Sequence, residues 1–170
     1  VFGSTITING TVEGDLIAAG QSIIINGTVK DDARIAGAAL QLGKTATVGG
    51  DVVAGSASFE AQDGSSIEGE LVAGAAQILL DGKISGDILA GAGALELNGD
   101  FGGNVKAEVG NPEDSGPPPS MYMPQSNIQF PNVKPGFSIA EGAKIKGNLE
   151  YTQWKDIKIP AKAGGGNCGQ

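Results

Sequence analysis

The fold is decided by a phrase that first occurs at residues 6–20 and reads ITINGTVEGDLIAAG. It contains two alternating apolar residues, an Asn-Gly turn, an apolar residue, a Gly-acid pair, two apolar residues and Ala-Gly. The apolar position after the turn recurs with steps of 17, 19, 19, 17 and 17 residues, at Val12, Val29, Val48, Ile67, Ile84 and Phe101. A fixed internal period is the signature of a repeat protein, so each phrase is one structural unit.

The phrase returns once after an interruption. Residues 139–149 read IAEGAKIKGNL and align without gaps, from Glu141 onward, on the unit at residues 61–71. This copy makes seven units, separated after the sixth by a proline-rich insertion. The predicted organisation is rungs one to six at 1–109, the insertion at 110–137, a terminal rung and C-terminal strand at 138–160, and a Gly-rich tail at 161–170.

A period of 17 to 19 residues is too short for helical repeats, which need about 33–47 residues. Pairs such as Ile6 and Ile8, or Leu40 and Leu42, have the strand period of two. Three short strands turned at glycines fill one unit. The sequence therefore predicts an all-β, single-stranded parallel β-helix (β-solenoid) of about seven triangular rungs. At a strand spacing of about 4.8 Å the stack is about 34 Å long, with Val12, Ile8 and their equivalents inside.

Composition excludes several functions. The chain has no histidine, which is the commonest general base and metal ligand, and one cysteine. A net charge of -8 argues against nucleic acid, because phosphate neutralisation needs clustered Lys and Arg. No stretch approaches the roughly 18–20 apolar residues of a membrane span, and no secretion signal opens the chain.

Two solenoid enzyme classes fit poorly. Hexapeptide acyltransferases depend on a histidine base, which is absent. Solenoids that cleave polysaccharides set acids across a groove walled by aromatic or basic residues. Here residues 1–109 hold a single arginine, Arg34, and no tryptophan or tyrosine. We therefore expect no enzyme activity, no catalytic residues and no cofactor.

One acid per rung is expected to form a column, at Asp15, Asp32, Asp51, Glu70 and Asp87. The simpler interpretation is a solvated face of turn residues. The alternative is a ladder for divalent cations, since carboxylate oxygens suit calcium. Asn104 and Asn148 replace the acid in two units, and we predict no metal site.

The ends of the stack carry the functional prediction. Terminal rungs expose strand edges and an apolar interior, and nothing resembling a cap precedes Ile6. Two complementary ends make a heterologous contact that generates a filament. The predicted interface is Phe2, Ile6 and Ile8 at one end and Leu149, Tyr151, Trp154 and Ile157 at the other.

Charge favours one polarity of that contact. Residues 1–110 carry five Lys/Arg and fourteen Asp/Glu, a net of -9, whereas residues 111–170 carry six and five, a net of +1. Head-to-tail contact is therefore favoured in a salt-dependent way. Head-to-head contact stays open, because the apolar end rungs can outweigh charge at the rim.

The insertion and the tail leave further alternatives open. The insertion either folds back on its own solenoid or lies as an arm on a neighbouring subunit, through Met121, Tyr122, Met123, Ile128 and Phe130. Cys168, in the Gly-rich tail, is either an ordinary tail residue or a crosslink between subunits in an oxidising space.

The Gly-Asp-apolar-apolar-Ala-Gly cadence, headed by Asn-Gly-Thr-Val-Glu-Gly-Asp at residues 9–15, resembles the bactofilins. The phrase at residues 145–152, IKGNLEYT, is similar to the closing rung of their exported, membrane-associated, polymer-forming relatives. The resemblance implies a right-handed β-helix that polymerises end to end without nucleotide as a scaffold.

The predicted function is thus a structural filament at the cell surface or envelope, built from copies of this chain alone. The cytoplasmic face of the membrane is the alternative location, with any envelope association passing through segments outside this chain. The alternative function is a non-polymerising module that docks its solenoid flank on an envelope polymer or a partner protein.

Overall fold

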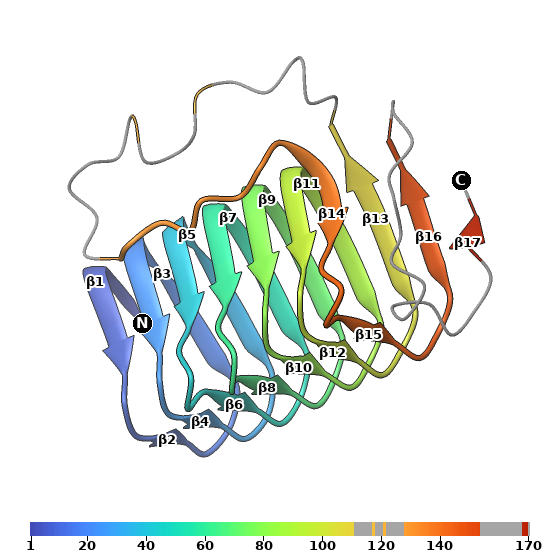
Figure 1. The fold of residues 1–170 in the computed structure, drawn as a ribbon. Helices are drawn as coiled ribbons and strands as arrows, with labels where there is room; N and C mark the ends of the chain where they lie inside the picture. Colours follow the sequence, from blue (N-terminus) through green and yellow to red (C-terminus); the bar gives the residue numbers. More distant parts are fainter. Residues whose placement is uncertain (111–116, 118–120, 122–127, 154–167, 170) are drawn as a thin grey trace.

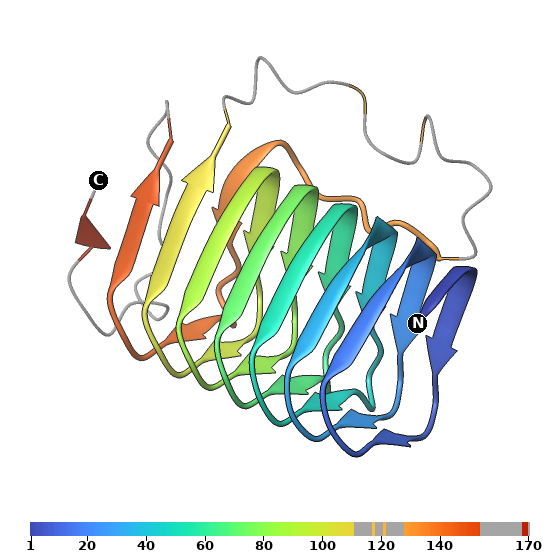
Figure 2. The same cartoon turned by 180° about the vertical axis from the view of Figure 1, so that it is seen from behind.

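The computed structural model of the chain is a parallel β-solenoid (Figure 1). It describes residues 1–110, 117, 121, 128–153 and 168–169. Successive turns stack along one axis, with the N-terminus and β1 at one end and β16 and β17 at the other (Figures 1 and 2). The fold predicted from the repeat is confirmed.

The described residues form two parallel sheets that run along the stack. The larger has ten strands in the order β1-β3-β5-β7-β9-β11-β13-β16-β17, with β14 pairing with β11 beside this path. Its strands are β1 (Phe2–Ile8), β3 (Leu16–Ile25), β5 (Ala33–Leu42), β7 (Val52–Ala61), β9 (Leu71–Leu80), β11 (Ile88–Leu97), β13 (Val105–Val109), β14 (Gly136–Ile139), β16 (Leu149–Thr152) and β17 (Cys168–Gly169).

The smaller sheet contains seven two-residue strands, one for each predicted unit. They are stacked in reverse sequence order, β15-β12-β10-β8-β6-β4-β2. Their bounds are β2 (Thr11–Val12), β4 (Thr28–Val29), β6 (Thr47–Val48), β8 (Ser66–Ile67), β10 (Lys83–Ile84), β12 (Asp100–Phe101) and β15 (Lys144–Ile145).

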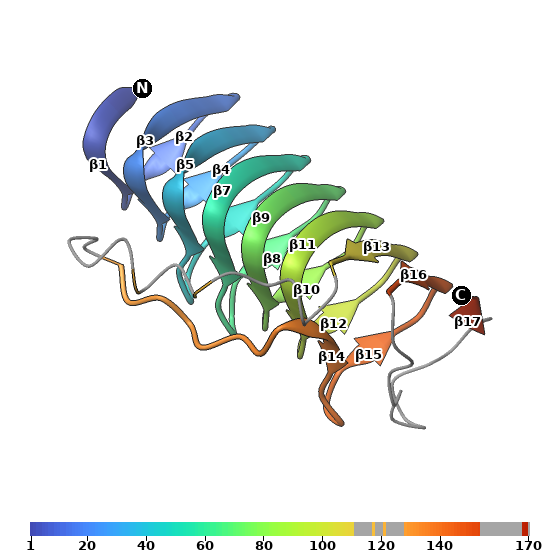
Figure 3. The same cartoon turned by 90° about the horizontal axis from the view of Figure 1, so that it is seen from above.

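Each long strand bends and supplies two sides of a turn, while the short strand supplies the third (Figure 3). In β7, Val52 and Ala54 are buried before the bend, and Phe59 and Ala61 after it. Val53 and Gly55 lie between them and are exposed. This alternation follows from the two-residue period of a strand, with one set of side chains inside the solenoid and the other on its outer face.

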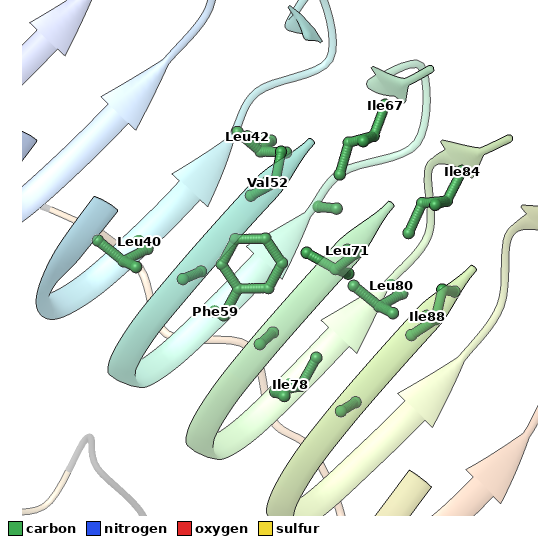
Figure 4. Packing of buried hydrophobic residues seen from close by; sticks show 14 of the residues in the cluster. Leu40, Leu42, Val52, Phe59, Ile67, Leu71, Ile78, Leu80, Ile84 and Ile88 are labelled. Atoms are coloured by element: carbon green, nitrogen blue, oxygen red, sulfur yellow. The ribbon is translucent and has the colours of Figure 1, made fainter. Parts of the chain in front are cut away.

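Equivalent positions stack as columns in the core (Figure 4). The column predicted from the turn-following residue is 0–1% exposed from the second unit to the sixth, at Val29, Val48, Ile67, Ile84 and Phe101. The column at Ile25, Leu42, Leu80 and Leu97 is fully buried. Each such side chain contributes about 1.5–3 kcal/mol by leaving water, so the repeat itself stabilises the stack.

Glycines at the turns are required by the closeness of successive rungs. A Cβ on Gly27 would collide with the backbone of Gly10 one rung earlier, and a Cβ on Gly99 with that of Gly82. Any larger residue would push the rungs apart, so glycine here fixes the stacking distance.

The insertion interrupts a turn at its bend instead of separating two complete rungs. β13 pairs with the first half of β11 and β14 with the second, through Ala92↔Val109 and Ala94↔Gly136. β14 begins at Gly136, so the predicted insertion boundary at residue 137 is corrected by two residues. Gly136 and Phe137 complete the sixth turn because they occupy the ladder positions next to Ala94 and Leu95.

Candidate functional site at the ends of the solenoid

The acidic column bonds successive rungs to one another. Along it, a side-chain oxygen of one rung accepts the backbone N–H of the equivalent residue in the next rung, at 2.8–3.2 Å. The acceptor–donor pairs are Asp15–Asp32, Asp32–Asp51, Asp51–Glu70, Asp87–Asn104 and Asn104–Asn148. A short side chain with a carbonyl or carboxylate oxygen meets this requirement, so Asn104 continues the column instead of breaking it.

This bonding gives the column a structural role that the sequence interpretation missed. Within the described ranges, no group of three or more His, Cys, Asp or Glu residues could hold a metal ion. The ladder of these hydrogen bonds also has a direction, because each side-chain oxygen that accepts a bond points to the following rung. It therefore presents a side-chain oxygen, that of Asn148, toward whatever follows the last rung.

The first rung is open. Among the described strands, β1 pairs only with β3 and β2 only with β4, so neither has a described strand on its outer side. Phe2 is 82% exposed, and Ile8 and Val12 are only partly buried. Their equivalents one rung later, Ile25 and Val29, are fully buried. The first rung therefore exposes an apolar interior that every later rung hides.

The last rung is closed at the level of its side chains. Leu149 is 3% exposed and Tyr151 is 7% exposed. The Tyr151 ring packs on that of Phe137, with centroids 5.5 Å apart. The sequence interpretation placed Leu149 and Tyr151 on a bare surface, and it is corrected because both side chains point into the chain's own core. The same prediction for Ile6 is corrected for the same reason, because this residue is only 6% exposed.

Two backbone features also protect the last rung. The side-chain oxygen of Gln153 accepts the N–H of Phe137 at 2.8 Å, on the edge of β14 that faces away from β11. β17 pairs in parallel with β16, through Leu149↔Cys168 and Glu150↔Gly169. Trp154 and Ile157 lie outside the described residues. The predicted crosslink through Cys168 stays a prediction.

The insertion lies on its own solenoid over residues 128–133. Ile128 and Val133 are 5% and 6% exposed, and Phe130 is partly buried. The Gln77 side chain donates to the backbone oxygen of Pro131 at 2.9 Å. The segment runs across the long strands toward β14 (Figure 3). Of the two interpretations of the insertion, folding back is the one the described contacts fit.

This segment explains a buried column that points away from the core. Ser22, Ser58 and Gln77 lie on the outer side of their strands and are only 2–3% exposed. Gln77 also donates to Ser58 Oγ at 3.0 Å. Of the other predicted arm residues, Met121 is 74% exposed, and Tyr122 and Met123 lie outside the described residues. The repeat carries no signal for this cover, because the contacts join a repeated to a non-repeated segment.

Comparison with known proteins gives no further identification. No family model, no curated protein and no solved structure matches the chain. In the part of the chain that the structure describes, no helix has both the length and the apolar character needed to cross a membrane.

Proposed function

We propose that this chain is a structural, non-catalytic protein that associates with copies of itself end to end, without nucleotide, into a β-solenoid filament. The observation that carries the proposal is the first rung, whose strands β1 and β2 each pair with one described strand only and whose Ile8 and Val12 are partly exposed. Unpaired edges and exposed apolar interiors are surfaces that repeat proteins cap or pair.

A head-to-tail contact would continue both ladders of the molecule. β2 of an incoming copy would follow β15, which pairs only with β12 among the described strands. The Asn148 side-chain oxygen would accept the backbone N–H of the incoming Asp15. Bonds of the same kind join successive rungs within the chain, for example from Asp51 N–H to Asp32 and from Asn148 N–H to Asn104. The acidic body and mildly basic C-terminal part favour the same polarity.

Growth at the last rung requires a local rearrangement. β17 occupies the place on Leu149 that Leu16 of the next copy would take, because both belong to one column of paired positions. An incoming Phe2 would likewise meet Thr152, which stands in its column. The proposal therefore requires β17, the Gln153 side chain and the first residues of the incoming chain to move during assembly.

The first test uses the backbone N–H of Thr7 on the outer side of β1. The Ile8 carbonyl accepts the N–H of Asn26, the residue directly after β3, so the N–H of the neighbouring Thr7 points away from β3. Thr7→Pro removes that donor without touching the β1–β3 bonds, which an edge strand tolerates. Thr7→Val keeps the N–H and is the matched control.

We expect the unmodified chain to form filaments in negative-stain images and to sediment as polymer at physiological salt without nucleotide. Thr7→Pro should raise the concentration needed for assembly at least tenfold, since it removes a bond worth about 1 kcal/mol and adds a steric clash. Thr7→Val should assemble normally. Monodisperse single particles of the unmodified chain, or normal assembly of Thr7→Pro, would contradict the proposal.

We further propose that the filament acts at the cell surface or envelope, as its resemblance to the exported relatives of bactofilins suggests. The alternative is a binding module. A shallow groove of about 430 Å³ on the flank favours it, lined by Val72, Leu89, Glu70, Asp87 and Lys106 among others. A chain that stays monomeric while binding an envelope polymer or partner would support that alternative.

A further inference from the structure

The outer face of the larger sheet carries a straight ridge of exposed apolar side chains. Ile17, Val53, Val72 and Leu89 are 58%, 45%, 39% and 50% exposed. Pairing puts them in one column with Arg34, Lys106 and Glu150. Figure 2 shows this face, a row of strands that includes the yellow β13 and the orange β16.

A trough runs beside the ridge, two residues further along each strand. Its members are small and mostly exposed, at Ala19, Ala36, Gly55, Gly74 and Gly91. A Cβ on any of these three glycines would meet nothing within 4 Å. Their small size is therefore not required by the chain's own packing, unlike that of Gly27 and Gly99.

The charges on this face are placed at its ends. Arg34, in the ridge, bonds to Asp15 and Asp32 at 3.4 and 3.2 Å. Lys106 lies in the ridge and Glu108 in the trough of the same strand, with Lys106 3.7 Å from Glu150. Basic and acidic side chains thus stand side by side across the line between ridge and trough.

We propose that this face binds a second copy of the chain, with the two solenoids side by side and parallel. A two-fold axis between ridge and trough, parallel to the solenoid axis, keeps the rungs level and reverses the strands. It lays each ridge on the other copy's trough, for example Val72 on the partner's Gly74. It also brings Lys106 to the partner's Glu108, twice by symmetry. Such a self-complementary contact is the isologous type.

The neighbouring acids fit this arrangement and argue against other occupants. The column of Asp15, Asp32, Asp51, Glu70 and Asp87 borders the ridge on the side away from the trough. In the paired arrangement the two acidic columns lie on opposite margins and do not face each other. A nucleic acid or an anionic lipid surface would meet these carboxylates directly.

The area of the ridge-and-trough face predicts weak pairing of two copies. Seven rungs at about 4.8 Å and four residues at about 3.3 Å give a face of roughly 450 Å². A stable interface buries about 800 Å² per partner. Single molecules should therefore pair with a dissociation constant of about 0.1–1 mM. Arrays of molecules would pair more tightly through multivalency. The inference does not depend on end-to-end assembly.

The test separates this face from the ends by using the Thr7→Pro background. Sedimentation equilibrium should show a weak dimer for Thr7→Pro alone. Adding Gly74→Leu fills the trough in open space, so folding is kept, and should weaken the dimer at least tenfold. Gly142→Leu is the matched control, because a Cβ there also meets nothing within 4 Å and it lies outside the face. The proposal would be overturned if Gly74→Leu and Gly142→Leu weakened the dimer equally. It would also be overturned if Thr7→Pro alone formed no dimer up to about 1 mM.

A charge exchange tests the register. Lys106→Glu and Glu108→Lys should each weaken the dimer several-fold at low salt, and the double variant should restore it. If Thr7→Pro does not fold, as judged by circular dichroism, the exchange is made in the unmodified chain. In the unmodified chain, we measure the fraction of filaments that are paired. If no filaments form, we measure the fraction of dimers. A double variant no better than the singles would overturn the two-fold arrangement. Binding of a Lys-rich peptide without self-association would overturn the choice of partner.

Discussion

The first and last rungs are built from the same repeat but finish the stack differently. At the first rung Ile8 and Val12 are partly exposed and β1 and β2 lack an outer neighbour among the described strands. At the last rung Ile139 and Ile145 are 7% and 4% exposed. The difference lies outside the repeat, because Gln153 and β17, which have no place in the phrase, cover the last rung. A repeat determines the middle of a solenoid, and its ends are determined by what flanks the repeat.

The largest expected effect contrasts a middle rung with the first. Ile25→Ala should lower the free energy of unfolding by about 3 kcal/mol, because it leaves a cavity in a fully buried column. Ile8→Ala removes the equivalent side chain at the open end and should cost about 1 kcal/mol or less. Urea unfolding followed by circular dichroism measures both. Equal losses would show that the first rung is covered in solution.

A second prediction opens the closed end. Deleting the last three residues, Cys168 to Gln170, removes β17 from its place on Leu149 and Glu150. End-to-end assembly should then need about tenfold less protein, since the incoming strand no longer competes with the chain's own segment. Light scattering over a concentration series measures this threshold. A higher threshold would show that β17 helps to join copies.

The smallest effect concerns the ladder of side-chain oxygens. Asp51→Ala leaves the N–H of Glu70 without its acceptor and should cost about 1 kcal/mol, whereas Asp51→Asn keeps an oxygen and should cost less. Asn148→Ala should cost less than Asp51→Ala in the isolated chain, because its oxygen faces the end of the stack. Thermal unfolding ranks the three variants. If Asn148→Ala lost as much stability as Asp51→Ala, the Asn148 oxygen would accept a hydrogen bond within the chain.

The repeat was sufficient to predict the solenoid and its core. Val29 and Phe101 lie where a fixed period places them, because every rung meets an almost identical neighbour. The same logic failed for contacts made once. The bond from Gln77 to Pro131, the acceptor role of Gln153 and the pairing of β17 each join a repeated to a non-repeated segment.

The candidate site was predicted in part for the same reason. The absence of a preceding cap predicts that Phe2 and Ile8 are exposed, and they are exposed and partly exposed, while their place in an interface stays a prediction. The assumption that both ends are alike predicts a bare surface at Leu149 and Tyr151, whose side chains are buried. The exposed ridge at Val72 and Leu89 was missed, although its positions alternate with buried ones in every long strand.

The bend where the chain departs after Val109 and rejoins at Gly136 has a consequence for how such a molecule changes over time. Val109 and Gly136 stand opposite Ala92 and Ala94, two ladder positions apart, so the excursion between them adds nothing to the spacing of the rungs. Bends of this kind can accept a longer, shorter or wholly different excursion while the skeleton keeps its dimensions. The inserted segment and the solenoid can therefore evolve, or be engineered, independently of each other.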